Sequence, residues 1–195
     1  MKKKEETYSG KVVYSRLKQY NFLFTYAMEK RIDSLAKLIY CTHIQGGKII
    51  LCGNGGSAAQ SLHFAAELNG KFRKRRSPIA AISLNSDVAT ITAIANDYKY
   101  DSVFARQLEA LGNSKDLFIV LSTSGESANI INALKTAQES KLNSFALLGK
   151  DGGIAQKYVN DCIIVTSEES AIVQEVHLLV IHIVCEIIDG FFPNE

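Results

Sequence analysis

Residues 51–59, Leu51-Cys52-Gly53-Asn54-Gly55-Gly56-Ser57-Ala58-Ala59, directly follow the apolar pair Ile49-Ile50. The pattern predicts a buried strand that runs into a glycine-rich turn, and the turn opens a helix. Glycines let the backbone approach a ligand without interference from a Cβ atom. The free N–H groups and the partial positive charge at the start of a helix favour phosphate. The stretch therefore predicts an anion-binding loop.

A second loop of this kind follows the apolar run 117–121 and reads Ser122-Thr123-Ser124-Gly125-Glu126-Ser127. Its hydroxyl groups can each donate a hydrogen bond to a terminal phosphate oxygen. The first loop also fits the loose dinucleotide pattern G-x-G-x-x-A, which alone is weak evidence. The acid that binds a ribose is expected about 20 residues after such a turn, and Asp87 comes well beyond that distance. We therefore expect a sugar-phosphate site in preference to a nucleotide site.

The rest of the chain alternates β-rich apolar runs with helical periodicity. Strands are expected over residues 48–52, 79–84, 117–121, 144–148 and 162–165, and helices over 58–68, 90–110, 128–137, 154–158 and 172–188. This order predicts an α/β fold with a doubly wound, mainly parallel five-stranded sheet. Ligands of such sheets bind beyond the carboxyl ends of the strands, where both loops fall.

The first 45 residues differ, because apolar residues recur there at helical spacing without a strand pattern. These residues are Leu17, Tyr20, Leu23, Phe24, Ala27, Met28, Ile32, Leu35, Ala36 and Ile39. We expect residues 1–45 to form an N-terminal helical segment for oligomerisation and residues 46–195 to form the sheet domain. Such helices can pack on their own sheet, but so much apolar helix in a short chain also favours an oligomer.

Composition narrows the class of partner. A net charge of +2 in 195 residues does not indicate a protein that binds nucleic acid. The basic cluster 71–76 is typical of a solvated loop, although it could add positive potential near an anionic substrate. The 4 cysteines show no C-x-x-C spacing and no apolar segment follows Met1, so we expect a reduced, cytoplasmic protein. The apolar run 172–188 is interrupted by polar residues, which predicts a core or interface helix and no membrane span.

Two predicted helices carry groups for chemistry. His63 and Glu67 lie four residues apart on the helix that the first loop opens, and so share one face. The last helix carries Gln174, His177 and His182. A carboxylate and imidazoles in one cleft suit either acid/base chemistry or a divalent metal. Spacing alone does not choose between His177 and His182.

Together these residues resemble the sugar isomerase (SIS) fold and, within it, the phosphoheptose isomerases. The resemblance runs from about Gly46 to Asp189. It rests on the stretches 53–57 and 63–68, Asn96-Asp97, Ser122-Thr123-Ser124-Gly125, 149–153, Gln174-Glu175 and Ile181-His182. The chain departs from the family pattern at Ile172, where relatives carry an arginine. Glu126 is expected to face solvent, since an inward carboxylate would repel phosphate.

The resemblance implies a role for each matching residue. The glycine loop, with Gly55, Gly56 and Ser57, and the hydroxyls of Ser122, Thr123, Ser124 and Ser127 bind the phosphate. Asn54, Asn96 and Asp97 bind sugar hydroxyls, and Gln174 contacts substrate or metal. The family also implies one Zn²⁺ per subunit, held by His63, Glu67, Gln174 and His182, and a homotetramer with composite active sites. It favours His182 over His177.

The reaction implied is the conversion of sedoheptulose 7-phosphate to D-glycero-D-manno-heptose 7-phosphate, which feeds heptose synthesis for lipopolysaccharide or another surface polysaccharide. Moving a proton between C1 and C2 needs a base and an acid, for which we expect Glu67 and His182 as the catalytic residues. The alternatives are a non-catalytic SIS adaptor that binds a replication initiator protein, and a nucleotide-dependent oxidoreductase. The presence of both Glu67 and His182 argues against the adaptor.

Overall fold

The computed structural model describes residues 7–23 and 25–193, except for the side chains of residues 21–23. The predicted apolar positions Leu23 and Phe24 therefore lie outside the described side chains. The chain forms an α/β fold around one five-stranded sheet in the order β2-β1-β3-β4-β5. Its strands are β1 (Ile49–Gly53), β2 (Ala81–Ser83), β3 (Leu117–Ser122), β4 (Asn143–Gly149) and β5 (Asp161–Val165). All neighbouring strands pair in parallel, which confirms the predicted fold class.

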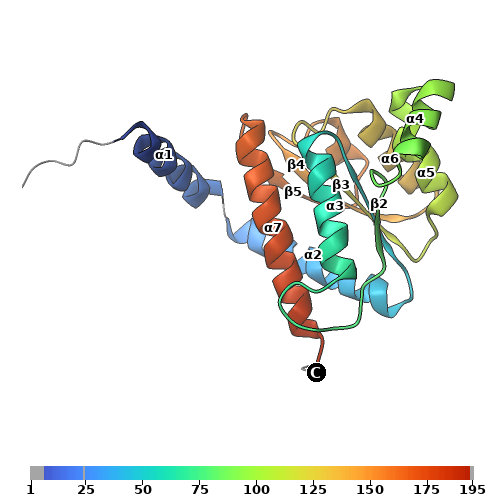
Figure 1. Cartoon of the computed structure of the whole chain (residues 1–195), viewed down its shortest axis with the longest axis horizontal. Helices are drawn as coiled ribbons and strands as arrows, with labels where there is room; N and C mark the ends of the chain where they lie inside the picture. Colours follow the sequence, from blue (N-terminus) through green and yellow to red (C-terminus); the bar gives the residue numbers. More distant parts are fainter. Residues whose placement is uncertain (1–6, 24, 194–195) are drawn as a thin grey trace, which may run out of the picture.

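Helices cover both faces of this sheet, as Figure 1 shows. Alternate strand residues enter two separate cores: Ile49 and Leu51 face one side, and Ile50 and Cys52 face the other. The first side is covered by α2 (Tyr26–Ile44), α3 (Gly56–Asn69) and α7 (Ser170–Phe191). The second side is covered by α4 (Val88–Asp97), α5 (Val103–Leu111) and α6 (Ala128–Glu139).

Two predicted helices take a different form. The single helix expected over residues 90–110 is interrupted after Asp97: Lys99 is extended, and the short 3₁₀ helix η1 (Tyr100–Ser102) precedes α5. The break falls in a polar stretch whose Asn and Asp side chains favour non-helical backbone. The helix expected over 154–158 is the 3₁₀ helix η2 (Ile154–Lys157).

The two N-terminal helices have different surroundings. Ile32, Leu35 and Ile39 of α2 are buried in the core under α7. In contrast, α1 (Tyr8–Leu23) projects from the body of the molecule (Figure 1). Near its end, Arg16 and Tyr20 contact the Glu175 carboxylate on α7, and Tyr20 also packs, partly buried, against the core. The segment thus contributes one helix to the core and leaves the other mostly exposed.

Helix α7 has the length and composition of a membrane span, but half of its apolar stretch is buried inside the fold. Val173, Val176, Val180 and Val184 belong to the core it shares with α2 and α3. The sequence prediction of a core helix is therefore confirmed.

Candidate active site

The two predicted phosphate loops leave the sheet side by side. Gly53 at the end of β1 is paired with Leu121 near the end of β3. After β1 the chain forms β2 on one side of it, and then returns to form β3 on the other side. The direction in which strands are added to the sheet therefore reverses between β1 and β3. Open α/β sheets bind ligands at this switch point.

The first loop is built close to the backbone of the helix it opens. Gly55, the N-cap of α3, has φ +54°, a left-handed conformation that favours glycine. A Cβ on Gly56 would come within 2.6 to 2.8 Å of the Gln174 side-chain amide. Ser57 is buried in the first turn of α3. Because Gly56 has no side chain, Gln174 of α7 can lie directly against the first loop.

The serine loop is held in shape by its own side chains. The Ser122 hydroxyl accepts a hydrogen bond from Gly125 N–H, and the Ser124 hydroxyl accepts one from Glu126 N–H, both at 3.1 Å. Ser127 is the N-cap of α6, so the loop ends at a helix start. The Glu126 carboxylate is exposed and accepts the Ile154 N–H at 2.9 Å. That contact ties Glu126 to η2.

A pair of asparagines joins the two loops. The amides of Asn54 and Asn129 donate to each other's oxygens at 2.8 and 2.9 Å, and Tyr100 Oη donates to Asn54 Oδ1 at 3.1 Å. Asn129 is buried two residues after Ser127. The structure thus gives Asn54 a structural task, and its contact with a sugar hydroxyl stays a prediction. Sequence reasoning missed Asn129, although its place directly behind the serine loop was a usable signal.

The predicted acid/base residues meet between α3 and α7. His63 Nε2 lies 3.0 Å from His182 Nε2, and Glu67 Oε1 lies 3.6 Å from His63 Nε2. Gly56 touches Gln174 and His63 touches His182, so both contacts advance in the same chain direction. The two helices therefore lie side by side and parallel, as Figure 1 shows. The ring of Phe72 stacks on His182 with centroids 5.5 Å apart. In the sequence, residues 71–76 indicate only a basic cluster and do not predict this contact.

Three of the predicted zinc ligands, His63, Glu67 and His182, have donor types that zinc accepts, and two of the distances among them can be compared with a zinc site. Two ligands of a tetrahedral zinc with bonds of about 2.0–2.2 Å lie about 3.3–3.5 Å apart, close to the His63–His182 and His63–Glu67 distances. The fourth, Gln174, lies with its amide against Gly56, about 12 Å along α7 from His182 by the helical rise. Among the described residues no three His, Cys, Asp or Glu side chains form a complete metal-binding group. The predicted ligands therefore form only part of a metal site.

His177 has a different place from His182. It is fully buried, and its Nε2–H donates to the Leu148 carbonyl at 3.1 Å, while Nδ1 has no described partner. Burial lowers the pKa of His177 to about 4, so the ring is neutral. Cys185 is also buried, and burial together with the charge of Glu67 raises the pKa of its thiol to about 12. Of the two histidines left open by spacing, His182 is the one that contacts His63, the partner of Glu67.

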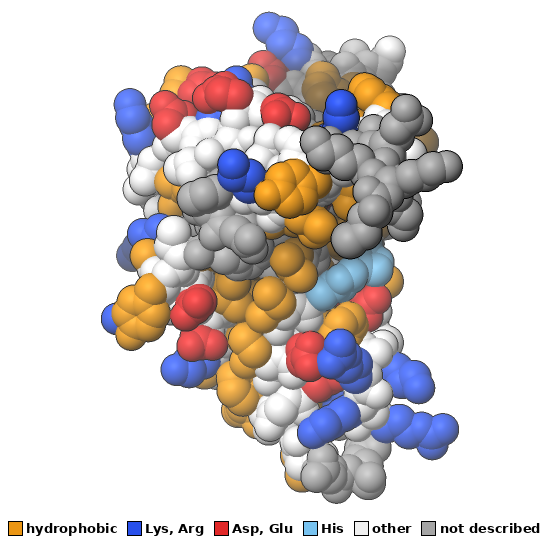
Figure 2. All heavy atoms as spheres, turned by 90° about the vertical axis from the view of Figure 1, so that its left-hand side faces the viewer, with side chains coloured by type: hydrophobic (Ala, Val, Ile, Leu, Met, Phe, Trp, Pro, Cys, Tyr) orange, Lys and Arg blue, Asp and Glu red, His pale blue; other side chains and the backbone are white. Residues whose placement is uncertain are grey.

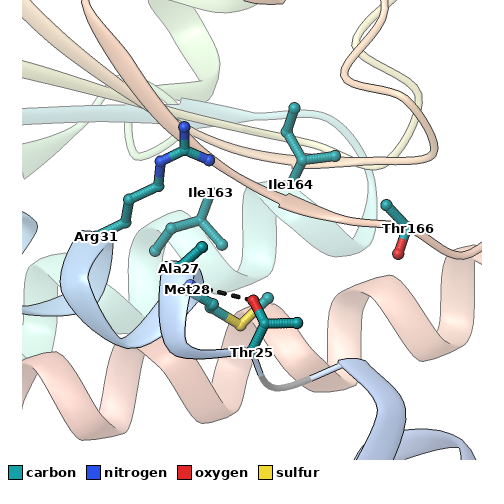
Figure 3. A pocket seen from close by; sticks show the side chains of 7 residues that line it. All are labelled: Thr25, Ala27, Met28, Arg31, Ile163, Ile164 and Thr166. Carbon is teal, nitrogen blue, oxygen red and sulfur yellow. Dashed lines mark hydrogen bonds between the residues drawn. The ribbon is translucent and has the colours of Figure 1, made fainter.

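Asn96 and Asp97 lie apart from these groups, on the exposed face of α4. The Asn96 amide donates to Asp97 Oδ1 at 2.9 Å, and Asp97 lines a cleft of about 480 Å³ between α4, α5 and β2. A second pocket, of about 130 Å³, lies between the start of α2 and β5 (Figure 3). No residue of the two loops or of the His63–Glu67–His182 group lines either cavity, and no described contact joins Asn96 or Asp97 to the loops.

The remaining departure, Ile172, is buried in α7. Ile172 therefore packs in the core, and its apolar side chain offers no polar contact to a substrate.

The parallel sheet, with glycine- and serine-rich loops at its switch point and His63 and Glu67 on the helix that the first loop opens, has the form of a SIS domain. The SIS domain family model matches residues 19–149. Phosphoheptose isomerase 1 of Campylobacter jejuni is 49% identical over 148 residues, which cover 76% of this chain and 80% of that protein. The Helicobacter pylori strain P12 phosphoheptose isomerase is 42% identical over 87% of this chain and 92% of its own length.

Solved structures agree. The phosphoheptose isomerase of Neisseria gonorrhoeae superposes with a TM-score of 0.85 at 36% identity, covering 94% of this chain and all of that one. The Francisella tularensis enzyme gives 0.82 at 37% identity, covering 94% and 95%. The chain belongs to the phosphoheptose isomerase family.

Proposed function

We propose that this chain converts sedoheptulose 7-phosphate to D-glycero-D-manno-heptose 7-phosphate, a step of heptose synthesis for a bacterial surface polysaccharide, in the cytoplasm. The relatives that carry this activity in their names span most of the chain. Its 4 free cysteines suit a reducing compartment.

The phosphate end of the substrate is assigned to the two loops at the switch point. The hydroxyls of Ser57, Ser122, Thr123, Ser124 and Ser127 lie in these loops or at the helix starts behind them. Helix N-termini and hydroxyl donors favour an anion. Since Glu126 is bonded to Ile154 N–H, its carboxylate is already used away from the phosphate.

The reacting end is assigned to Glu67 and His182, and their meeting beside His63 is the observation that carries the proposal. In the first step a base removes a proton from C1 while the C2 carbonyl oxygen is protonated, which gives an enediol. In the second step the O1 proton leaves and a proton returns to C2, which gives the aldehyde at C1. Glu67 suits the carbon proton and His182 the oxygen or the opposite carbon.

Position supports this assignment. Glu67 lies on the helix that begins at the phosphate loop, so its distance from the bound phosphate is fixed by a rigid element. His182 lies on the neighbouring helix with its Nε2 beside His63. An adaptor that only binds a partner protein needs no such arrangement of a carboxylate and imidazoles.

A zinc ion is part of the proposal. His63, Glu67 and His182 would hold it, and Gln174 would join them if its amide left Gly56. When bound, zinc would supply a Lewis acid for the developing oxyanion. A carboxylate oxygen bound to zinc is a poor base, so Glu67 can serve both tasks only through different lone pairs. Elemental analysis after reconstitution with zinc should find one ion per chain in the parent protein and much less in His63→Ala. Equal contents in the two proteins would reject these ligands.

We also propose a homotetramer. Exposed apolar side chains gather on α1, α3 and α7: Val12, Val13, Tyr14, Leu17, Leu62, Leu178 and Leu179. Figure 2, which shows the side of the molecule at the left of Figure 1, has a strip of hydrophobic side chains between charged ones. Apolar surface of this extent is normally covered by a partner, and a second copy is the commonest partner for a soluble enzyme.

The direct test of the function is turnover of sedoheptulose 7-phosphate by the purified protein, with and without a chelator. The proposal expects formation of the aldose phosphate, and loss of activity after chelation that zinc restores. No turnover by the zinc-loaded protein would reject the proposed reaction. Full activity in zinc-free protein would reject only the metal.

A further inference from the structure

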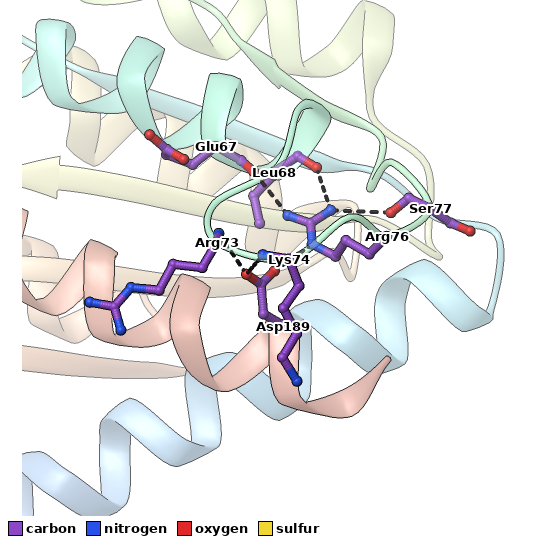
Figure 4. A network of polar contacts seen from close by, with 7 residues as sticks. All are labelled: Glu67, Leu68, Arg73, Lys74, Arg76, Ser77 and Asp189. Carbon is purple, nitrogen blue, oxygen red and sulfur yellow. Dashed lines mark hydrogen bonds and ion pairs between the residues drawn. The ribbon is translucent and has the colours of Figure 1, made fainter. Parts of the chain in front are cut away.

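A buried ion pair lies at the far ends of the two helices that carry the acid/base residues (Figure 4). Arg76 Nε donates to Asp189 Oδ1 at 2.9 Å, and the two side chains are 0% and 3% exposed. The other Asp189 oxygen accepts the backbone N–H groups of Arg73 and Lys74 at 2.9 and 3.0 Å. Burial raises the pKa of Asp189, but these N–H donors and Arg76 outweigh it and keep the pKa below its ordinary value. The carboxylate is therefore charged.

The guanidinium also caps the end of α3. Its Nη2 donates to the Glu67 carbonyl at 2.9 Å and its Nη1 to the Leu68 carbonyl at 3.0 Å. The last four carbonyls of a helix have no partner within the helix. Arg76 donates to two of them: the Leu68 carbonyl, which also accepts the Ile79 N–H at 3.0 Å, and the carbonyl of Glu67, the proposed catalytic base. The backbone at Glu67 is thus bonded, through Arg76, to Asp189 on α7.

The same carboxylate orders the groups around His182. Asp189 lies seven residues after His182 and so on the same face of α7. Its bond to Arg73 N–H fixes the loop directly after Phe72, whose ring stacks on His182. Arg73 is paired in addition with Glu186. One carboxylate thereby constrains both Glu67 and the ring against His182.

We propose that Arg76 and Asp189 are positioning residues of the isomerase site, which set the distance between Glu67 and His182. Neither residue touches the reacting atoms. The inference rests on the proposed function, because it needs Glu67 and His182 to be the acid/base pair. A displacement of about 1 Å in such a group can cost on the order of 10²-fold in rate.

The chain offers a matched control in Asp116, directly before the first residue of β3. The Asp116 side chain is 0% exposed and accepts Lys48 Nζ at 2.5 Å. It also accepts the backbone N–H groups of Lys48 and Asn113, both at 2.9 Å. This carboxylate has the same kinds of partner as Asp189. It lies before the first residues of β1 and β3, whereas the phosphate loops follow their last residues.

The experiment compares Asp189→Asn with Asp116→Asn in steady-state turnover of sedoheptulose 7-phosphate, at a temperature where circular dichroism shows each protein folded. For Asp189→Asn we expect kcat to fall at least about tenfold while KM stays within about threefold, because the phosphate loops are untouched. For Asp116→Asn we expect a comparable loss of thermal stability with kcat within about twofold of the parent. Arg76→Lys, which keeps the charge but loses the planar fork, repeats the test if Asp189→Asn does not fold.

Unchanged kcat in folded Asp189→Asn, or in folded Arg76→Lys where that variant is used, would overturn the inference. So would an equal fall of kcat in Asp116→Asn, since a purely structural role would then explain both. The parent protein and Glu67→Gln, measured in the same assay, distinguish failure of the proposed function from failure of the positioning role. An inactive parent, or an active Glu67→Gln, would reject the proposed function or its base and not merely the positioning role.

Discussion

At the scale of single residues, the serine loop shows how one hydroxyl can have two uses. Ser124 Oγ accepts the Glu126 N–H and so shapes the loop. The same hydroxyl keeps its own proton, which it can donate to a phosphate oxygen. A side chain that is proposed to bind the phosphate therefore also holds the loop in shape before the phosphate arrives.

Ser124→Ala tests the phosphate end. Loss of a hydrogen bond to a charged group costs roughly 1.5 to 3 kcal/mol, so we expect KM to rise about tenfold or more with little change in kcat. Ser140→Ala, at the exposed C-cap of α6, is the control and should leave both constants unchanged. An unchanged KM in Ser124→Ala would place the phosphate elsewhere.

At the scale of secondary-structure elements, α7 carries two histidines with opposite surroundings. His182 lies at the contact with α3, whereas His177 points into the core and donates to the Leu148 carbonyl of β4. A neutral, buried imidazole of this kind makes stability depend on pH.

The folded pKa of His177 is lowered from 6.5 to about 4. Between these values the unfolded chain binds a proton that the folded chain does not, so stability falls as the pH falls. From pH 7 to pH 4.5 this residue should cost the fold about 2 kcal/mol. Urea unfolding of the parent and of His177→Gln across this range measures the difference. Parallel pH dependence in the two proteins would show that His177 does not titrate in this way.

Elements with a strong local pattern could be predicted from sequence. The strands of the sheet centre, the helices behind both loops and the one-face spacing of His63 and Glu67 all follow from periodicity. The break between α4 and α5 was missed, although the polar stretch around Asn96 and Asp97 disfavours a helix and was a usable signal. The reciprocal Asn54–Asn129 pair and the stacking of Phe72 on His182 join residues far apart in sequence, and single-sequence patterns carry no information on such pairs.

At the scale of the whole molecule, α1 is the element with least support. Val12, Val13, Tyr14 and Leu17 are exposed, and the contacts described between α1 and the body involve Arg16 and Tyr20 near its end. This exposure agrees with a proposed assembly in which neighbouring copies cover α1.

Leu17→Asp tests this assembly. Leu17 is 58% exposed in the single chain, so a charge there should not disturb the monomer fold. Light scattering at micromolar concentration should give four times the chain mass for the parent and a smaller species for the variant. Lys18→Asp, an exposed polar neighbour, controls for the added charge. A monomeric parent would rule out the tetramer.

The central claim is that Glu67, placed by the helix that begins at the phosphate loop, removes the carbon proton. Glu67→Gln keeps the shape of the side chain and removes its basicity. The decisive measurement is deuterium incorporation from D₂O at C1 of sedoheptulose 7-phosphate, followed by NMR, with metal content determined on the same sample. The parent should exchange this proton during turnover, and the folded, metal-replete variant should lose exchange and turnover by roughly 10²- to 10⁴-fold. Exchange at the parent's rate in that variant would contradict the account and make His182 the candidate base.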